Sequence, residues 1–419
     1  MKRWRGLMLL LAAAPLVPAA AAAQGPATCT VQLDSVGGQG RQSEVAPGVV
    51  HWFGGGGVWA SCHGRPTRMR ADSGAYYSER ERVDFVGHVH FRDSTVTLDS
   101  QRASYFTRDE RLEAYGDVHL VNLETGSQLD GSALTYWRAA PGARDTAEML
   151  ATNRPTVRYR AKGDTAEPYV IVGQQVRLRG DDRTWAGGNV TIDRRDFRSQ
   201  SDSAELNLGA GKGSFIGHAQ VQGRGTNAYS LSGRRVVFKM TDRKLSWAEA
   251  QGLGDATSSD WRLRADTIAF DVVREQIEHG TAWGDSLRPD ARSVRYTMKA
   301  DSVALDTPGQ RLTELRGFGK AVSTAARDSL DGQPDWVAGD SLIARFDTTA
   351  AGERILTELE ARGAARAYYR VFDADGSTLA GINYSRGRRL QAAFDEKGVH
   401  RVKVLEGGDG VYLEPVKKP

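Results

Sequence analysis

The chain lacks the motifs of the common catalytic and nucleotide-binding sites. Its 419 residues contain no G-x-S-x-G motif, no H-E-x-x-H motif and no Cys/His pair of a thiol enzyme. Gly54 to Gly57 form a glycine-rich stretch that could bind a small anion through its backbone N–H groups. A P-loop is excluded, because no Lys-Ser/Thr follows these glycines. No cluster of carboxylates of the kind found in polysaccharide-degrading enzymes stands out. We therefore expect a protein that is not an enzyme.

Charge of one sign is not concentrated anywhere along the chain. The net charge is +4, and it falls to +1 without Lys2, Arg3 and Arg5 at the start. Basic and acidic residues are mixed throughout the remainder. A nucleic-acid partner is not expected, because there is no basic stripe to follow a phosphate backbone.

Long apolar runs are absent except at the N-terminus. Leu7 to Ala23 is apolar, is preceded by the basic residues above, and ends in three alanines before Gln24. This pattern predicts an export signal over residues 1–23, cleaved after Ala23. The alternative is an uncleaved membrane anchor, which Pro15 and Pro18 and the short length of the run disfavour.

Cysteine is scarce. Cys29 and Cys62 are the only two, and they are 33 residues apart with no C-x-x-C spacing, which argues against a redox or metal role. After export to an oxidising compartment such a pair predicts a disulfide, the alternative being two free, buried thiols. We expect the disulfide to close an atypical N-terminal cap segment, residues 24–67.

A repeat of about 30 residues fills most of the rest of the chain. Its first half is a small residue, then Asp, then Ser or Thr, followed by alternating apolar residues; the aspartates are Asp72, Asp202, Asp266, Asp301 and Asp340. Its second half is a glycine before a short apolar strand; these glycines are Gly87, Gly116, Gly188, Gly217, Gly252, Gly284, Gly319, Gly363 and Gly408. Because the aspartates occur once per repeat, we interpret them as bend-forming residues that bond local backbone, with catalysis or calcium binding as the alternative.

Each copy predicts two strands joined by a short polar turn, and hence an antiparallel hairpin. The predicted fold class is all-β: an elongated antiparallel sheet built from repeated hairpins over residues 68–415. Within it, the Pro-, Ala- and Gly-rich stretch 138–168 is expected to be an inserted hairpin or loop.

Alternation gives every strand one apolar and one polar face. The positions on the apolar face are Val89, Phe91, Val118, Leu120, Val190, Ile192, Ile268, Phe270, Val303 and Leu305. They predict either a closed core filled by its own side chains or a groove for a long apolar ligand.

Histidine offers one metal candidate on the polar face. His88 and His90 share a strand face, and His119 has the equivalent position in the next copy. Solvent-facing histidines are the alternative, which we favour, so neither a metal nor a cofactor is expected.

The repeat resembles the OstA-like family, which includes LptA, the periplasmic lipopolysaccharide-transport protein, and the N-terminal domain of LptD. Residues 71–77, 86–89, 98–100 and 114–118 carry the resemblance most clearly, and residues 382–412 resemble the closing unit of long members. The chain departs from short members in its length, its cysteine-bearing segment and the stretch 138–168.

The resemblance implies a folded-over β-jellyroll whose apolar interior holds acyl chains. It implies a periplasmic protein, with or without association with the outer membrane, that transports lipopolysaccharide or a related lipid. Its partners would be other lipopolysaccharide-transport components and further copies joined end to end. In this interpretation the ten apolar positions above contact lipid. The alternative is a structural or adhesive β-repeat protein with a closed core.

Overall fold

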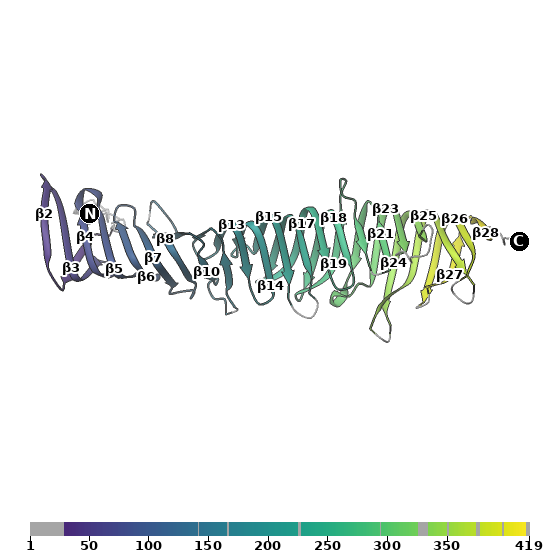
Figure 1. Cartoon of the computed structure of the whole chain (residues 1–419), viewed down its shortest axis with the longest axis horizontal. Coiled ribbons are helices and arrows are strands. Elements are labelled where there is room, and N and C mark those ends of the chain that lie inside the picture. The colour runs from purple at the N-terminus through teal and green to yellow at the C-terminus, as the bar shows by residue number, and fades with distance from the viewer. Residues whose placement is uncertain are drawn as a thin grey trace, which may run out of the picture.

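The computed structural model describes residues 29–415 apart from 141, 166, 225–227, 294, 326–333, 350–351, 374–377 and 396–397. The predicted signal, residues 1–23, lies outside the described residues. Figure 1 shows an elongated molecule in which the strands run across the long axis and follow one another from one end to the other. Helix is limited to two short 3₁₀ turns among these residues, Ser78–Arg80 and Pro308–Gln310.

The architecture is a single all-antiparallel sheet of 28 strands within the described part of the chain. Sixteen strands cross the whole width of the sheet, and we call each such crossing a rung. They are β3 (Val49–Cys62), β4 (Arg68–Tyr77), β5 (Arg82–Arg92), β6 (Val96–Phe106), β7 (Arg111–Asn122), β8 (Gln128–Trp137), β13 (Arg183–Asp193), β14 (Phe197–Asn207), β15 (Lys212–Gly223), β16 (Ser230–Thr241), β17 (Lys244–Thr257), β18 (Arg262–Val273), β23 (Glu314–Ala325), β24 (Trp336–Thr348), β25 (Arg354–Phe372) and β26 (Leu379–Asp395).

Each of the other six rungs consists of two short strands in line. The pairs are β1 (Val31–Val36) with β2 (Gly40–Ala46), β9 (Glu148–Thr152) with β10 (Thr156–Tyr159), β11 (Tyr169–Val172) with β12 (Gln175–Arg179), β19 (Gln276–Trp283) with β20 (Asp290–Arg292), β21 (Tyr296–Lys299) with β22 (Ser302–Asp306), and β27 (Gly398–Leu405) with β28 (Asp409–Leu413). Every rung between the first and the last pairs with the rung before it and the rung after it in the chain, as in β13 with β14 and β14 with β15. Stacking 22 rungs at about 4.8 Å gives a length of about 100 Å.

A corner in the middle of the rung, built from left-handed residues in every second rung, explains the repeat. In β15, Gly217 and His218 both have left-handed backbone, with φ of 74° and 47°. The pairing of β15 with both neighbouring strands shifts register at this point, so the corner is a β-bulge. Two consecutive left-handed residues turn the strand sharply, and glycine takes the first position at little cost because it has no Cβ.

The repeated aspartates lie against these glycines. A β-carbon added at Gly217 would overlap the carboxylate of Asp202 in the preceding strand, and one at Gly319 would overlap that of Asp301. Asp72, Asp266 and Asp340 stand in the same relation to Gly87, Gly284 and Gly363. The aspartates are therefore structural, but their main partner is the corner of the next rung. Of the five, Asp266 also accepts hydrogen bonds from the backbone, at Ser286 and Leu287.

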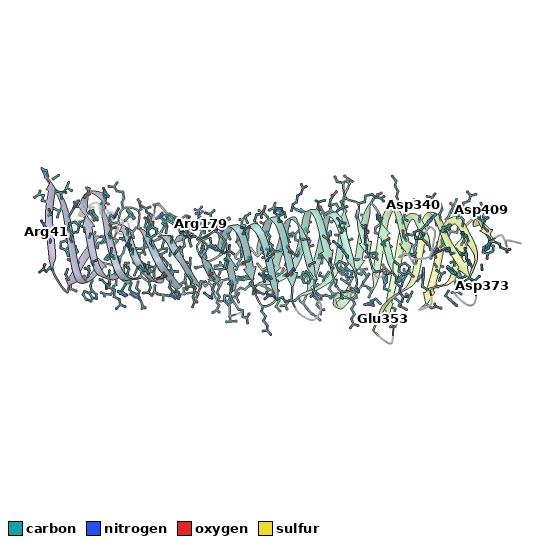
Figure 2. The ribbon with its side chains drawn as sticks, viewed as in Figure 1. Arg41, Arg179, Asp340, Glu353, Asp373 and Asp409 are labelled. Atoms are coloured by element: carbon teal, nitrogen blue, oxygen red, sulfur yellow. A yellow bond between two sulfur atoms is a disulfide. The ribbon has the colours of Figure 1, made fainter. Side chains whose placement is uncertain are left out.

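The corner divides each rung into two arms whose apolar faces turn toward one another. In β5, Val83 and Phe85 are buried before the corner, and Val89 and Phe91 after it. Rings meet across the interior between strands that do not pair: Phe91 of β5 lies 6.4 Å from Tyr136 of β8. The buried side chains form one continuous cluster from Cys29 to Ala392. Charged side chains project outward along the whole length, from Arg41 to Asp409 (Figure 2).

Two segments that depart from the sequence repeat still take part in the sheet. Residues 31–62 form β1, β2 and β3, the first strands of the ladder. The stretch 138–168, expected as an inserted hairpin or loop, contains β9 and β10, and these pair with β8, β11 and β12 instead of with each other. Asn153 and Arg154 supply the left-handed corner of this rung in place of a glycine, which hides the repeat in the sequence.

The corner contact predicts different outcomes for two nearby glycine substitutions. Gly319→Ala should lower the free energy of unfolding by about 2–3 kcal/mol, because it combines a left-handed alanine with an overlap onto Asp301. Gly309→Ala should cost about 1 kcal/mol, since Gly309 is also left-handed but open space surrounds its β-position. Urea denaturation followed by circular dichroism measures both.

The double variant Asp301→Ala/Gly319→Ala is the control. It should be more stable than Gly319→Ala, because removing the carboxylate relieves the part of the overlap that involves Cγ and Oδ2, although the Cβ of residue 301 remains close. Equal losses for Gly319→Ala and Gly309→Ala would show that the aspartate does not shape the corner.

Candidate functional site

The ten apolar positions singled out from the sequence all lie inside the fold. Each is at most 3% exposed. They are spread along the length of the interior and do not gather at one place. Leu120 borders a hollow, and Leu305 borders a cavity of about 20 Å³, which holds about one water molecule. Around Leu305 the interior is thus filled by the protein's own side chains.

Open space lies instead on the side of the molecule opposite the corners. There the turns at the ends of the two arms face each other along a line that we call the seam. We call the two rows of turns lip A and lip B. Lip A includes residues 93–95, 123–127, 160–165, 167–168, 194–196 and 258–261, and lip B includes residues 107–110, 138–140, 142–147, 180–182, 242–243, 274–275 and 308–311. Three hollows open along the described part of the seam, with volumes of about 250, 300 and 520 Å³ from the N-terminal side to the C-terminal side.

The middle hollow has apolar walls and a charged rim. Its walls come from strand ends on both lips and comprise Phe197, Phe215, Val221, Leu231, Val236, Phe238, Met240, Leu245, Ala248 and Val272. The rings of Phe215 and Phe238 stack with centroids 5.4 Å apart. Burial, together with the charge of Asp196, raises the pKa of Tyr229 to about 12, so this wall residue stays neutral. At about 300 Å³, the hollow is at the lower end of the size range of small-molecule sites.

Side chains bridge the seam on either side of the middle hollow. Arg243 on lip B donates hydrogen bonds of 3.0 Å to the backbone carbonyls of Lys162 and Gly163 on lip A. Further along, Arg354 lies 4.0 Å from Asp260 across the seam. These contacts hold the lips at a fixed spacing where the hollows open.

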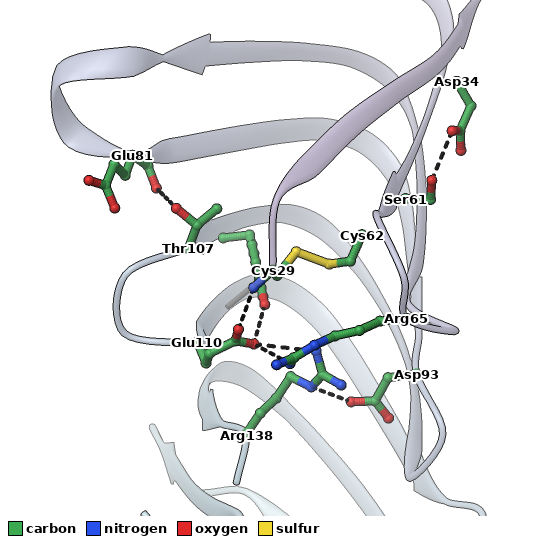
Figure 3. The surroundings of a disulfide bond; sticks show 11 residues. Cys29, Asp34, Ser61, Cys62, Arg65, Glu81, Asp93, Thr107, Glu110 and Arg138 are labelled. Atoms are coloured by element: carbon green, nitrogen blue, oxygen red, sulfur yellow. Dashed lines mark hydrogen bonds and ion pairs between the residues drawn. A yellow bond between two sulfur atoms is a disulfide. The ribbon is translucent and has the colours of Figure 1, made fainter. Parts of the chain in front are cut away.

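At the N-terminal end a disulfide and a buried charge network close the seam. Cys29 and Cys62 are joined by a disulfide, with Cα atoms 5.1 Å apart. The backbone N–H of Cys29 donates to Glu110 on lip B at 2.6 Å, and Arg65, next to Cys62, approaches the same carboxylate at 3.3 Å (Figure 3). Cys29 is thereby held between the lips.

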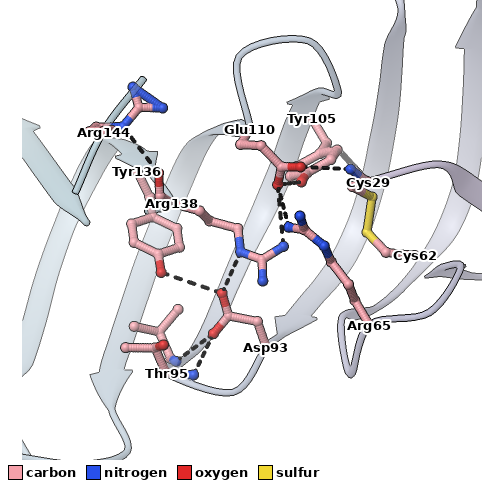
Figure 4. A network of polar contacts seen from close by, with 11 residues as sticks. Cys29, Cys62, Arg65, Asp93, Thr95, Tyr105, Glu110, Tyr136, Arg138 and Arg144 are labelled. Atoms are coloured by element: carbon pink, nitrogen blue, oxygen red, sulfur yellow. Dashed lines mark hydrogen bonds and ion pairs between the residues drawn. A yellow bond between two sulfur atoms is a disulfide. The ribbon is translucent and has the colours of Figure 1, made fainter. Parts of the chain in front are cut away.

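Arg138 is the centre of this network. Its guanidinium, from lip B, lies 3.1 Å from Asp93 on lip A and 3.3 Å from Glu110 (Figure 4). Asp93 also accepts hydrogen bonds from the backbone N–H groups of Thr95 and Val96. The side chains of Asp93 and Glu110 are 1% and 2% exposed, so the ion pairs are shielded from water. We call Arg65, Asp93, Glu110 and Arg138 the clasp.

Two buried tyrosines donate hydrogen bonds to the carboxylates of the clasp. Tyr105 donates its hydroxyl proton to Glu110 at 2.8 Å, and Tyr136 donates to Asp93 at 3.3 Å. Burial, and then the neighbouring carboxylates, raise the pKa of both hydroxyls well above the ordinary value. Both therefore remain proton donors throughout the physiological pH range.

The histidines considered as metal ligands lie on the outer face. His88, His90 and His119 each place Nδ1 beside a different carboxylate, that of Asp72, Asp99 and Asp130 respectively, at 2.7–2.8 Å. No group of three potential metal ligands comes together among the described residues. The structure thus gives each of these imidazoles a carboxylate as its hydrogen-bond partner.

Sequence reasoning missed the seam, including the clasp and the middle hollow. Phe215, Phe238 and Leu245 follow the same alternation as the positions chosen from the sequence, but they lie toward the strand ends, near turns. A usable signal is the run from Phe238 to Leu245, in which apolar positions flank two basic residues, Arg243 in the turn and Lys244 at the start of β17.

Comparison with known proteins gives no relative. No protein-family model matches the chain, and no curated protein matches it. Within the described residues, no helix has the length and apolar character needed to cross a membrane.

The clasp predicts that Arg138 matters far more for stability than an exposed arginine. Arg138→Met should cost about 3 kcal/mol, because it leaves two buried carboxylates without their shared cation. Hydrogen–deuterium exchange should accelerate in peptides from β3 to β8. The control Arg386→Met breaks an exposed pair with Asp409, and it should change exchange little. Equal effects of the two substitutions would mean that the clasp does not hold the lips together.

Proposed function

We propose that the protein is a non-enzymatic lipid carrier of the periplasm, working in outer-membrane biogenesis on lipopolysaccharide or a related lipid. The observation that carries the proposal is the middle hollow, where an apolar space of about 300 Å³ opens to solvent between charged lips. A ligand suited to it has an apolar chain for the walls and a polar group for the rim.

The resemblance to the OstA-like family supports the same assignment. A sheet bent at every rung around an apolar interior is the arrangement expected of its β-jellyroll. Lipopolysaccharide-transport components would be the partners, and copies could join through the strands that end the ladder, β1 and β2 at one end and β27 and β28 at the other.

In this proposal acyl chains approach from the seam. The walls of the hollows are the first contacts, at Phe238 and Leu245 for example. The ten deeper positions, such as Phe91 and Phe270, are buried by their own neighbours, so they would meet lipid only when the arms separate. The clasp closes the N-terminal end. Separation of the arms would therefore begin further along, where single bridges such as that of Arg243 hold the lips.

The close packing of those ten positions favours a second candidate. A structural or adhesive β-repeat protein would need a filled interior and no cargo, and the small cavity beside Leu305 fits that description. The two candidates differ in what the middle hollow contains in the cell.

A photo-crosslinker at the hollow separates them. With benzoylphenylalanine in place of Phe238, irradiation of cells that make lipopolysaccharide should give an adduct detected by an antibody to lipopolysaccharide. The matched control carries the same group in place of Phe318. This side chain is 45% exposed and lies next to the corner glycine Gly319. Adducts with protein alone at position 238, or equal lipid adducts at both positions, would favour the closed-core protein.

A further inference from the structure

The three hollows of the seam differ in charge. The N-terminal hollow is lined by two acidic residues, Glu124 and Asp181, and by no Lys or Arg. The C-terminal hollow is balanced, with Arg295, Arg311 and Arg354 against Asp260, Glu353 and Asp395. The middle hollow has five basic residues against two acidic ones: Arg194, Arg224, Arg243, Lys244 and Arg274 against Asp196 and Glu275. The middle hollow alone among these three combines apolar walls with an excess of positive charge.

On lip A that positive charge is already neutralised. Arg194 pairs with Asp196 at 2.6 Å, and it also donates to the hydroxyl of Tyr169. Arg224 lies 2.8 Å from Asp193. Carboxylates thus hold these two guanidiniums against their own lip, and a ligand would have to compete for them.

On lip B two cations remain available. Arg243 is occupied by the backbone carbonyls across the seam and lies 4.0 Å from Asp164. Lys244 and Arg274 are exposed, and neither forms an ion pair with a carboxylate in the described part of the chain. Glu275, which follows Arg274, is the acidic residue that lip B contributes to this hollow.

Tight turns fix the positions of these two cations. Asp242 and Arg243 are both left-handed, as are Arg274 and Glu275, so each pair forms the loop of a two-residue hairpin. The hairpins β16–β17 and β18–β19 are neighbours because β17 pairs with β18. Lys244 begins β17 and Arg274 directly follows β18, so the two residues lie at the ends of neighbouring strands, and their long side chains are within reach of one bound group.

We propose that the middle hollow is a binding site for an amphiphile with an anionic head group, a phosphate or a carboxylate. The apolar chain lies against Phe215 and Phe238, and the head group lies at the rim between Lys244 and Arg274. This assignment rests on the proposed lipid-binding function, and it adds the charge of the ligand and the place where its head group binds.

Binding of matched amphiphiles tests the site. Isothermal titration calorimetry below the micelle concentration compares dodecyl phosphate with the neutral dodecyl maltoside, using the purified full-length chain. Wild type should bind the phosphate at least about tenfold more tightly, because charge-assisted hydrogen bonds form to the head group. Lys244→Gln/Arg274→Gln should lose about tenfold in affinity for dodecyl phosphate and change little for dodecyl maltoside.

The control is Arg295→Gln/Arg311→Gln, which removes two cations from the charge-balanced C-terminal hollow. It should leave the affinity for dodecyl phosphate within about twofold of wild type. A loss as large as that of the first pair would place the site elsewhere and overturn the assignment. Circular dichroism verifies that both variants fold, and all four substituted residues are exposed.

Three other outcomes would contradict the proposal in different ways. Equal affinity of wild type for both amphiphiles would overturn the anionic site and leave lipid binding intact. Binding of neither would overturn both this site and the proposed function. Displacement of dodecyl phosphate by an equal concentration of inorganic phosphate would show recognition of the anion without its apolar chain, which overturns an amphiphile site.

Discussion

The contact between a corner glycine and the side chain lying over it determines the rest of the structure. An antiparallel sheet with one apolar face must cover that face, and this chain does so by bending every rung in the middle. In alternate rungs the bend contains two left-handed residues in a row, and at Gly217 the space over the first of them is taken by Asp202, a side chain of the preceding rung. Repetition of this contact brings the arms together, creates the interior and leaves the turns facing each other along a seam.

The seam is where polar chemistry and apolar surface meet. Inside, the walls are those of an ordinary packed core; on the outer face, carboxylates and cations are paired in water. The lips place charges beside buried aromatic rings, and they do so differently along the molecule. At the N-terminal end Arg138 ties lip B to Asp93 and excludes water. In the middle, the cations of lip B border a space that the protein does not fill. The same fold thus has a closed seam at its N-terminal end and an open hollow in its middle.

Much of the fold could be predicted from the sequence, because the signals were local and repeated. Alternation identified the inward faces of strands such as β5 and β7, and the once-per-repeat aspartates pointed to a structural role. The rung at 148–159 was missed because Asn153 and Arg154 replace the expected glycine at its corner. The seam could not be predicted, since Lys244 and Arg274 are 30 residues apart and each looks like an ordinary turn residue. Their proximity arises from the stacking of hairpins, which no local pattern encodes.

The bent rung also restricts how such a chain can change in length during evolution. One residue inserted within an arm would exchange the inward and outward faces beyond it, so arms should resist insertions. Corners and turns carry no such penalty, and the extra residues of this chain are found there, at 284–289 in a corner and at 138–147 and 160–168 in turns. A single added rung would reverse the chain direction and send every later turn to the opposite lip. Growth by duplication should therefore proceed two rungs at a time, in steps of about 10 Å, which keeps each lip on its own side of the seam.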